Sequence, residues 1–127
     1  MKKVLFTDKG ASPKGPYSQA VLVSGKLLFT AGQGPFEPGS GEVVGDTFQE
    51  QTIRAFENIK AIAENAGASL KDVVKLNFYL SDWKYMGEFN ELFAQYFPED
   101  PPARVPLKVD IPFGFIMMDA VIAVPDV

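Results

Sequence analysis

Six stretches of the chain carry short apolar runs or alternate apolar with polar side chains, a pattern typical of β-strands. They cover residues 4–6, 20–23, 27–31, 72–80, 103–109 and 115–124. Only Ser24, Gly25 and Lys26 separate the second stretch from the third, so these two are predicted to form a hairpin. A further short strand is predicted at 42–44, inside a loop rich in Gly.

Two other segments place apolar side chains three or four residues apart, which is the spacing of one helix face. The first covers residues 47–66, where Thr47 and Glu50 match a capping box and Gly67 ends the helix. The second begins after Asp82 and ends before Pro98. The predicted buried faces are Ile53, Phe56, Ile59, Ile62 and Ala66 in the first helix, and Trp83, Met86, Phe89, Phe93 and Tyr96 or Phe97 in the second.

The predicted order of elements is β-β-β-α-β-α-β-β, which indicates an α+β fold. We expect a single mixed sheet of about six strands, with both helices packed on one face. The 127 residues fit one domain, spanning residues 1–127. The other face of the sheet would be bare, and several of its residues, such as Met118, Val121 and Ala123, are apolar. A bare apolar face predicts that copies of the chain associate.

Charge and composition narrow the range of functions. The formal net charge is −4 and the basic residues are scattered, which argues against a nucleic-acid binder. No segment approaches the roughly 18 apolar residues of a membrane helix, and the N-terminus lacks the apolar stretch of a signal peptide, so a cytoplasmic protein is expected. The chain has no Cys and no His, which excludes thiol nucleophiles, Ser-His-Asp triads and the common zinc sites. Proton transfer must therefore use Asp, Glu, Lys, Tyr, backbone groups or water.

Asp119 is the single acid among the apolar residues of the last predicted strand. A buried carboxylate without a partner is costly, so Asp119 needs a partner, a raised pKa or exposure at a cleft. The residues alone favour a solvent-facing position on an edge strand.

Arg104 belongs to the strand predicted at 103–109 and lies on the face opposite the alternating apolar residues of that strand. Its neighbour Pro106 suggests a sheet edge or a bulge, because proline cannot donate a hydrogen bond to a sheet. Since this strand directly precedes the strand of Asp119, antiparallel pairing would make Arg104 and Asp119 neighbours. The planar guanidinium also suits a carboxylate ligand. From the residues alone, a surface charge or a structural ion pair stays ahead of a ligand clamp.

Three more places in the chain are candidates for a site. Tyr17 lies where a loop rich in Gly and Pro enters a strand, a place that often presents side chains. Asn90 lies beside the buried stripe of the second helix. Gly32 and Gly34 follow a strand in "TAGQGP", which lacks the third Gly and the helix of a dinucleotide-binding motif. Taken singly, Tyr17 is explained better by ordinary packing and Asn90 by a satisfied boundary position, while the exposed backbone of "TAGQGP" could contact a ligand but is a weak phosphate motif.

Together, these stretches resemble the RidA family, also called YjgF/YER057c/UK114. The similarity runs in order through nearly the whole chain. It comprises "GPYSQA" at 15–20, "FTAGQGP" at 29–35, residues 41–82, "FNELFAQYF" at 89–97, "PPAR" at 101–104 and "DAVIAV" at 119–124. The resemblance implies a chorismate mutase-like α+β fold and a homotrimer, with inward-facing sheets and three clefts between subunits.

The resemblance further implies hydrolysis of reactive 2-imino acids, such as 2-iminopropanoate and 2-iminobutanoate, to 2-keto acids and ammonia. No metal or organic cofactor is implied. Arg104 would bind the substrate carboxylate through two parallel hydrogen bonds, Tyr17 would line and close the pocket, and Gly32 would supply backbone contacts. Asn90 would support the cleft. Asp119, which stands where the family commonly has Glu, would orient or activate water.

The chain departs from the family pattern at three places. Asp119 is one methylene shorter than Glu, a difference of roughly 1.5 Å in reach. Val105 and Pro106 stand where deaminase-active members often have Ser and Cys, and Ala31 replaces a common Ser. These changes make the polar end of the pocket more apolar, which predicts a different substrate preference or weaker catalysis.

Two other functions stay open. The protein could bind small carboxylates without catalysis, as a metabolite sensor or a protective factor, and this role needs Arg104 but not Asp119. Some family members carry the description of ribonuclease or translation inhibitor. The acidic net charge, the scattered lysines and the absence of His weigh against that activity here.

Overall fold

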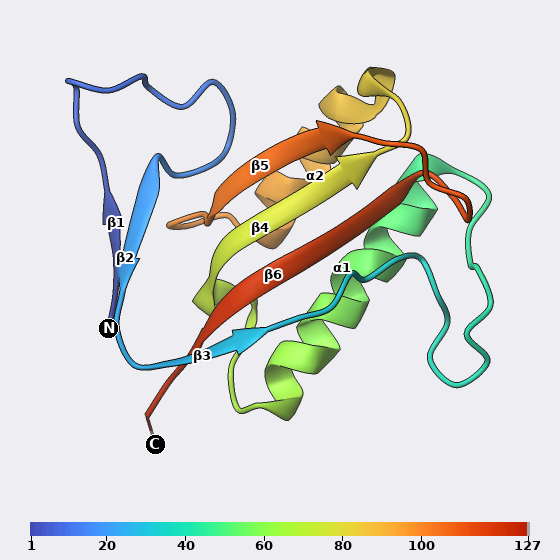
Figure 1. The fold of residues 1–127 in the computed structure, drawn as a ribbon, viewed down its shortest axis with the longest axis horizontal. Helices are drawn as coiled ribbons and strands as arrows, with labels where there is room; N and C mark the ends of the chain where they lie inside the picture. The colour runs from blue at the N-terminus through green and yellow to red at the C-terminus, as the bar shows by residue number, and fades with distance from the viewer. Residues whose placement is uncertain (127) are drawn as a thin grey trace.

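The computed structural model describes residues 1–126 and contains the strands and helices in the predicted order (Figure 1). These are β1 (Lys2–Leu5), β2 (Ala20–Val23), β3 (Lys26–Phe29), α1 (Phe48–Asn65), β4 (Val73–Leu80), α2 (Met86–Tyr96), β5 (Ala103–Lys108) and β6 (Ile116–Val124). Two short 3-10 helices, η1 (Leu70–Asp72) and η2 (Trp83–Tyr85), precede β4 and α2. The predicted strand at 42–44 is reduced to a bridge between Val43 and Phe36.

The main sheet has four strands in the order β3-β6-β4-β5. β4 and β5 run parallel, whereas β6 pairs antiparallel with both β3 and β4, so the sheet is mixed. Helix α2 makes the crossover that a parallel pair requires. Both helices lie on the same face of this sheet, as Figure 1 shows, and the predicted α+β fold is confirmed.

The six strands divide into one sheet of two strands and one of four. The expectation of a single sheet is therefore wrong. The predicted hairpin between residues 20–23 and 27–31 is also wrong, because β2 pairs with β1 and β3 pairs with β6. Gly25 has a φ of 102°, a left-handed conformation that lets the backbone turn sharply between the two strands. The hairpin was predicted because the two strands are close in sequence, but β3 pairs with the long central strand β6 instead.

The predicted antiparallel pairing of the Arg104 and Asp119 strands is wrong. β4 lies between β5 and β6, so the two strands never touch. The chain returns through α2 before β5 begins, and β5 therefore adds to β4 in parallel at the edge of the sheet. The expectation that Pro106 marks a sheet edge is confirmed, because its missing N–H faces no further strand.

Helix α1 begins as predicted. Thr47 and Glu50 form a complete capping box, in which the Thr47 hydroxyl accepts from the Glu50 N–H. Ile53, however, is exposed, because the buried stripe of α1 runs one residue to the side of it. The buried residues are Phe48, Gln51, Thr52, Ala55, Phe56, Ile59 and Ala63. Trp83 is also half exposed, because it belongs to η2 and does not follow the periodicity of α2.

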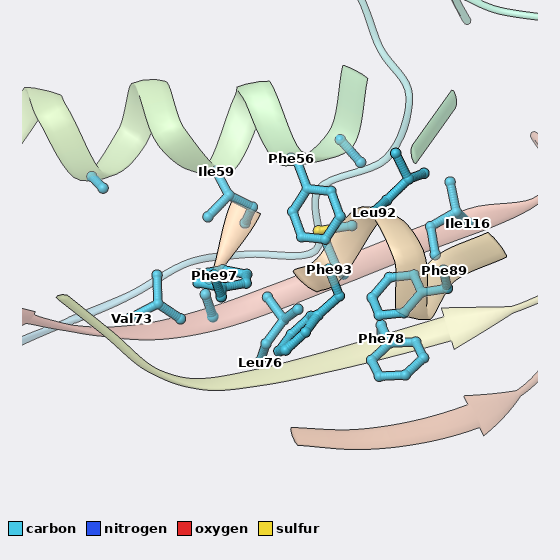
Figure 2. Close-up of a cluster of buried hydrophobic side chains, with 14 of the residues drawn as sticks. Phe56, Ile59, Val73, Leu76, Phe78, Phe89, Leu92, Phe93, Phe97 and Ile116 are labelled. Carbon is cyan, nitrogen blue, oxygen red and sulfur yellow. The ribbon is translucent and has the colours of Figure 1, made fainter. Parts of the chain in front are cut away.

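Aromatic side chains fill the space between the helices and the sheet (Figure 2). The helices contribute most of these rings and β4 contributes Phe78, which stacks on Phe89 of α2. The labelled side chains in Figure 2 are all nearly or fully buried: Phe56, Ile59, Val73, Leu76, Phe78, Phe89, Leu92, Phe93, Phe97 and Ile116. This core anchors α2, while β5 joins the fold through its parallel pairing with β4.

The second face of the main sheet carries neither helix (Figure 1). Met118 was expected on this face but is fully buried on the helix side, since it lies in register with the buried Phe78. Val121 and Ala123 do lie on the open face, together with the exposed apolar side chains of Leu27, Phe29, Val105 and Leu107. Neither helix within residues 1–126 is long and apolar enough to cross a membrane.

Candidate functional site

Arg104 projects from β5 toward the helices. It lies in register with the buried Leu76 of β4, so both side chains are on the covered face of the sheet. The guanidinium is ringed by aromatic side chains, with its Cζ between 4.7 and 6.0 Å from four ring centroids. These rings belong to Tyr17, Phe78, Phe89 and Phe93. Such cation–π contacts stabilise a positive charge that has left water.

Within residues 1–126, the guanidinium makes one hydrogen bond. Its Nη2 donates to Oδ1 of Asn90 on α2, at 2.6 Å. Nε and Nη1 are buried and have no hydrogen-bond partner among residues 1–126. Burial lowers the pKa of Arg104 to about 10, which still leaves it charged at neutral pH. A buried cation without a matching anion is costly, and an anionic ligand would offset that cost.

A cavity of about 260 Å³ opens beside this guanidinium. It is lined by Lys14, Tyr17, Met86, Asn90, Arg104 and Pro106. Three of the sequence candidates, Arg104, Tyr17 and Asn90, are therefore brought together in one place. The sequence reasoning missed Lys14 and Met86 as lining residues, although Lys14 stands immediately before the "GPYSQA" motif.

The loop that carries Tyr17 is docked against Arg104. The Lys14 N–H donates to the Tyr17 hydroxyl at 3.1 Å, and the Ser18 N–H donates to the carbonyl of Pro102 at 3.2 Å. Gly15 lies close to the arginine: a Cβ at this position would lie 2.8 Å from Arg104 Nη2. The absence of a side chain at Gly15 is what lets the loop approach the guanidinium.

Asp119 belongs to the other face of the sheet. It lies in register with Asn77, whose amide donates to Asp119 Oδ1 at 2.9 Å. The Tyr79 hydroxyl donates to Oδ2 at 2.7 Å, and this bond raises the pKa of Tyr79. The expectation that Asp119 needs a partner is met by these two neighbours. Its predicted proximity to Arg104 is wrong, because the two side chains point to opposite faces of the sheet.

Gly32 also lies away from the Arg104 cavity. A Cβ at this position would lie 2.9 Å from Sδ of Met117, the β6 residue that shares a face with Asp119. The candidates thus form two groups in one chain. Arg104, Tyr17 and Asn90 line the cavity on the covered side, whereas Gly32 and Asp119 lie on the open side. Among residues 1–126, no group of three or more acidic side chains gathers closely enough to hold a metal ion.

Comparison with known proteins identifies the chain. The family model described as Endoribonuclease L-PSP matches residues 7–112. A RutC family protein of Pyrococcus abyssi is 52% identical over 108 residues, which are 85% of this chain and 84% of that protein. The chain belongs to the RidA family. The crystal structure of RidA from an Antarctic Psychrobacter has the same fold, with a TM-score of 0.74 and 36% identity over 96% of this chain and 99% of that one.

A further member of the RidA family has a name that refers to chemistry. TdcF of Escherichia coli K12, which is named as a candidate reactive intermediate deaminase, is 37% identical over 99 residues. The match covers 78% of this chain and 75% of TdcF. The description of the family model refers to a ribonuclease and the name of TdcF refers to a deaminase, so the geometry of the site must decide which activity is favoured here.

Proposed function

We propose that this RidA family protein hydrolyses 2-imino acids, of the 2-iminopropanoate and 2-iminobutanoate type, to 2-keto acids and ammonia. The observation that carries the proposal is the desolvated guanidinium of Arg104 at the edge of a small cavity, with two nitrogens that have no hydrogen-bond partner in the described part of the chain. A planar guanidinium binds a carboxylate better than any other side chain does. The name of TdcF supports the same chemistry.

In this reaction the protein mainly has to orient the imine and place a water molecule beside it. The protonated imine is already an electrophile, so water adds to its C2 atom, the C–N bond then breaks, and ammonia leaves as the keto group forms. Arg104 would hold the carboxylate and thereby orient C2 toward the water. A carboxylate near the water can accept its proton. In this proposal Asp119 has that role.

Bidentate binding of a carboxylate by Arg104 requires a side chain of the cavity to move. Nε and Nη1 are shielded from solvent by the surrounding side chains. Phe78, Phe89 and Phe93 belong to the core and are fully buried, whereas Tyr17 comes from a surface loop. Tyr17 is therefore the ring that shifts when a carboxylate enters, and it then closes over the bound ligand.

A complete site in this proposal needs two copies of the chain. Arg104 and Asp119 point to opposite faces of one sheet, so one chain cannot place both on the same small substrate. We propose a homotrimer in which the open faces of the sheets pack together. Gly32 and Asp119 of one copy would then complete the cavity beside Arg104 of the next. The exposed apolar residues of the open face support such an assembly.

The proposal is tested by measuring the decay of 2-iminopropanoate and 2-iminobutanoate, generated in place by an amino-acid oxidase. We expect the wild-type protein to accelerate the decay over buffer and Arg104→Ala to abolish the acceleration. Lys108→Ala, an exposed change on the same strand, is the matched control and should behave as wild type. Decay at the buffer rate with the wild-type protein would refute the proposed reaction.

Binding of small carboxylates without catalysis is the alternative that the same cavity supports. It predicts that 2-ketobutyrate binds to the wild-type protein and to Asp119→Ala equally well, while no imine is turned over. The proposed hydrolysis instead predicts that Asp119→Ala slows imine decay more than it weakens 2-ketobutyrate binding. Calorimetry and the decay assay on the same two proteins separate these functions.

A further inference from the structure

The cavity beside Arg104 has an unbalanced charge. Two of its lining residues, Lys14 and Arg104, are cationic, and none of the lining residues among 1–126 is acidic. Asn90, the hydrogen-bond partner of the guanidinium among the described residues, is neutral. A ligand with a single carboxylate on Arg104 would offer no second anion to Lys14 at the mouth of the same cavity.

Lys14 is held at the cavity by its backbone. Its N–H donates to the hydroxyl of Tyr17, and the ring of Tyr17 lies over the guanidinium of Arg104. The exposed Lys14 side chain is long and flexible, with a mobile ammonium at its end. The stem of Lys14 therefore starts at the mouth of the cavity, and the ammonium can meet an anion that projects from it.

Part of the cavity lining is apolar. Met86 and Pro106 line the cavity and offer apolar surface. A matching ligand therefore has an anion at each end and a short hydrocarbon spacer between them. A dicarboxylic acid derived from glutamate or aspartate has this pattern.

Resting on the proposed function, we infer that the preferred substrates are 2-imino dicarboxylic acids, with the C1 carboxylate on Arg104 and the distal carboxylate on Lys14. The reaction is unchanged: water adds to C2, ammonia leaves, and a 2-keto dicarboxylic acid forms. Lys14 is thus a specificity-determining residue. An acid supplied by a neighbouring copy, such as Asp119, would still leave the cavity with a net positive charge.

The test compares two stable products, 2-oxoglutarate and 2-ketobutyrate, as ligands of the whole protein by calorimetry at low ionic strength. The readout is the ratio of their affinities. We expect wild type to favour 2-oxoglutarate and Lys14→Gln to reduce this preference about two- to fivefold, the range for a solvent-exposed ion pair. Lys9→Gln changes a lysine of the same loop that does not line the cavity, and it should keep the wild-type ratio. Added salt should reduce the preference, because it screens exposed charges.

Equal affinities in wild type, or a Lys14→Gln ratio equal to the wild-type ratio, would overturn the inference. Imines generated from glutamate and from 2-aminobutyrate then separate the two proposals. Hydrolysis of 2-iminobutanoate without any preference for 2-iminoglutarate overturns only the role of Lys14. A preference for 2-oxoglutarate in binding, with no imine hydrolysed, overturns the reaction and keeps the ligand class.

Discussion

At the scale of single residues, the position of the Arg104 guanidinium depends on its neighbouring side chains and on the lack of a side chain at Gly15. Asn90 holds one nitrogen of the guanidinium, and aromatic rings surround the rest. Gly15 leaves just enough room for the loop to reach Nη2. The orientation of the guanidinium is therefore set jointly by α2 and by the loop before β2.

Gly15→Ala should weaken carboxylate binding. The new Cβ would lie 2.8 Å from Arg104 Nη2, so the guanidinium or the loop must move. A displacement of about 1 Å near a reacting group can cost roughly a hundredfold in rate, so we expect a large loss of imine hydrolysis and weaker 2-ketobutyrate binding. Activity and calorimetry measure both effects.

The control for this change is Gly87→Ala in α2, where a Cβ meets no atom within 4 Å. It should leave activity and binding near the wild-type values, because alanine in a helix favours stability. Wild-type binding by Gly15→Ala, with an unchanged melting temperature, would show that the close approach has no role.

At the scale of secondary-structure elements, a few polar side chains connect segments of the chain through hydrogen bonds. Gln51 of α1 is buried and connects two loops: its amide donates to the Gly45 carbonyl, and its Oε1 accepts from the Phe115 N–H. Tyr96 of α2 donates to Glu57 of α1 at 2.9 Å. These bonds determine how α1 sits relative to β6 and α2.

Gln51→Ala should destabilise the fold. The change leaves the Gly45 carbonyl and the Phe115 N–H without partners, and each such loss typically costs about 1 to 3 kcal/mol. Urea unfolding measures the free energy of unfolding. Gln49→Ala, an exposed change in the same helix, is the control and should cost little. A stability equal to wild type for Gln51→Ala would mean that water replaces both bonds.

Tyr96 should make stability depend on alkaline pH. Burial and the bond to Glu57 raise the pKa of Tyr96 to about 12, above the ordinary value of 10. The neutral phenol is thus favoured in the folded state. Its contribution is complete below pH 10 and is lost as the pH rises to about 12, because the unfolded chain ionises first.

The measurement compares wild type with Tyr96→Phe in urea at pH 8 and at pH 11. Using the difference between the two proteins removes the effect of other titrating groups. We expect the stability advantage of wild type over Tyr96→Phe to shrink at pH 11. An advantage that grows with pH would contradict the raised pKa.

At the scale of the whole molecule, the open face of the main sheet exposes apolar side chains. The side chain of Phe29 on β3 is 69% exposed, and Leu107 on β5 is 48% exposed. These residues lie at the two edges of the same sheet, with β6 and β4 between them. Apolar exposure across a whole sheet face is typical of surfaces at which copies associate.

Phe29→Asp should therefore dissociate the proposed homotrimer. The side chain is mostly exposed within one chain, so the change should cost the fold little, whereas a buried charge in an interface is costly. Light scattering should give three times 13.9 kDa for wild type and 13.9 kDa for the variant. Trp83→Asp, at a half-exposed position on η2, is the control. A monomeric wild type, or a trimeric Phe29→Asp, would contradict the assembly.

Much of this protein could be predicted from local sequence. The order of strands and helices and the capping box of α1 follow from apolar spacing and from residues within a few positions of one another. The family motifs identified three residues that the fold brings to one cavity: Arg104, Tyr17 and Asn90. Local patterns reach this far because each depends only on neighbouring residues.

Tertiary structure decided which strands pair and which faces meet. The order β3-β6-β4-β5 is set by long-range contacts that no local pattern contains, so the predicted hairpin and the predicted pairing of β5 with β6 were both wrong. Since successive residues of a strand point to opposite faces, strand order and register together decide which side chains share a face. That physical fact placed Arg104 and Asp119 on opposite sides of the sheet, whereas the positions of the loop before β2 and of α2 brought Lys14 and Met86 to Arg104.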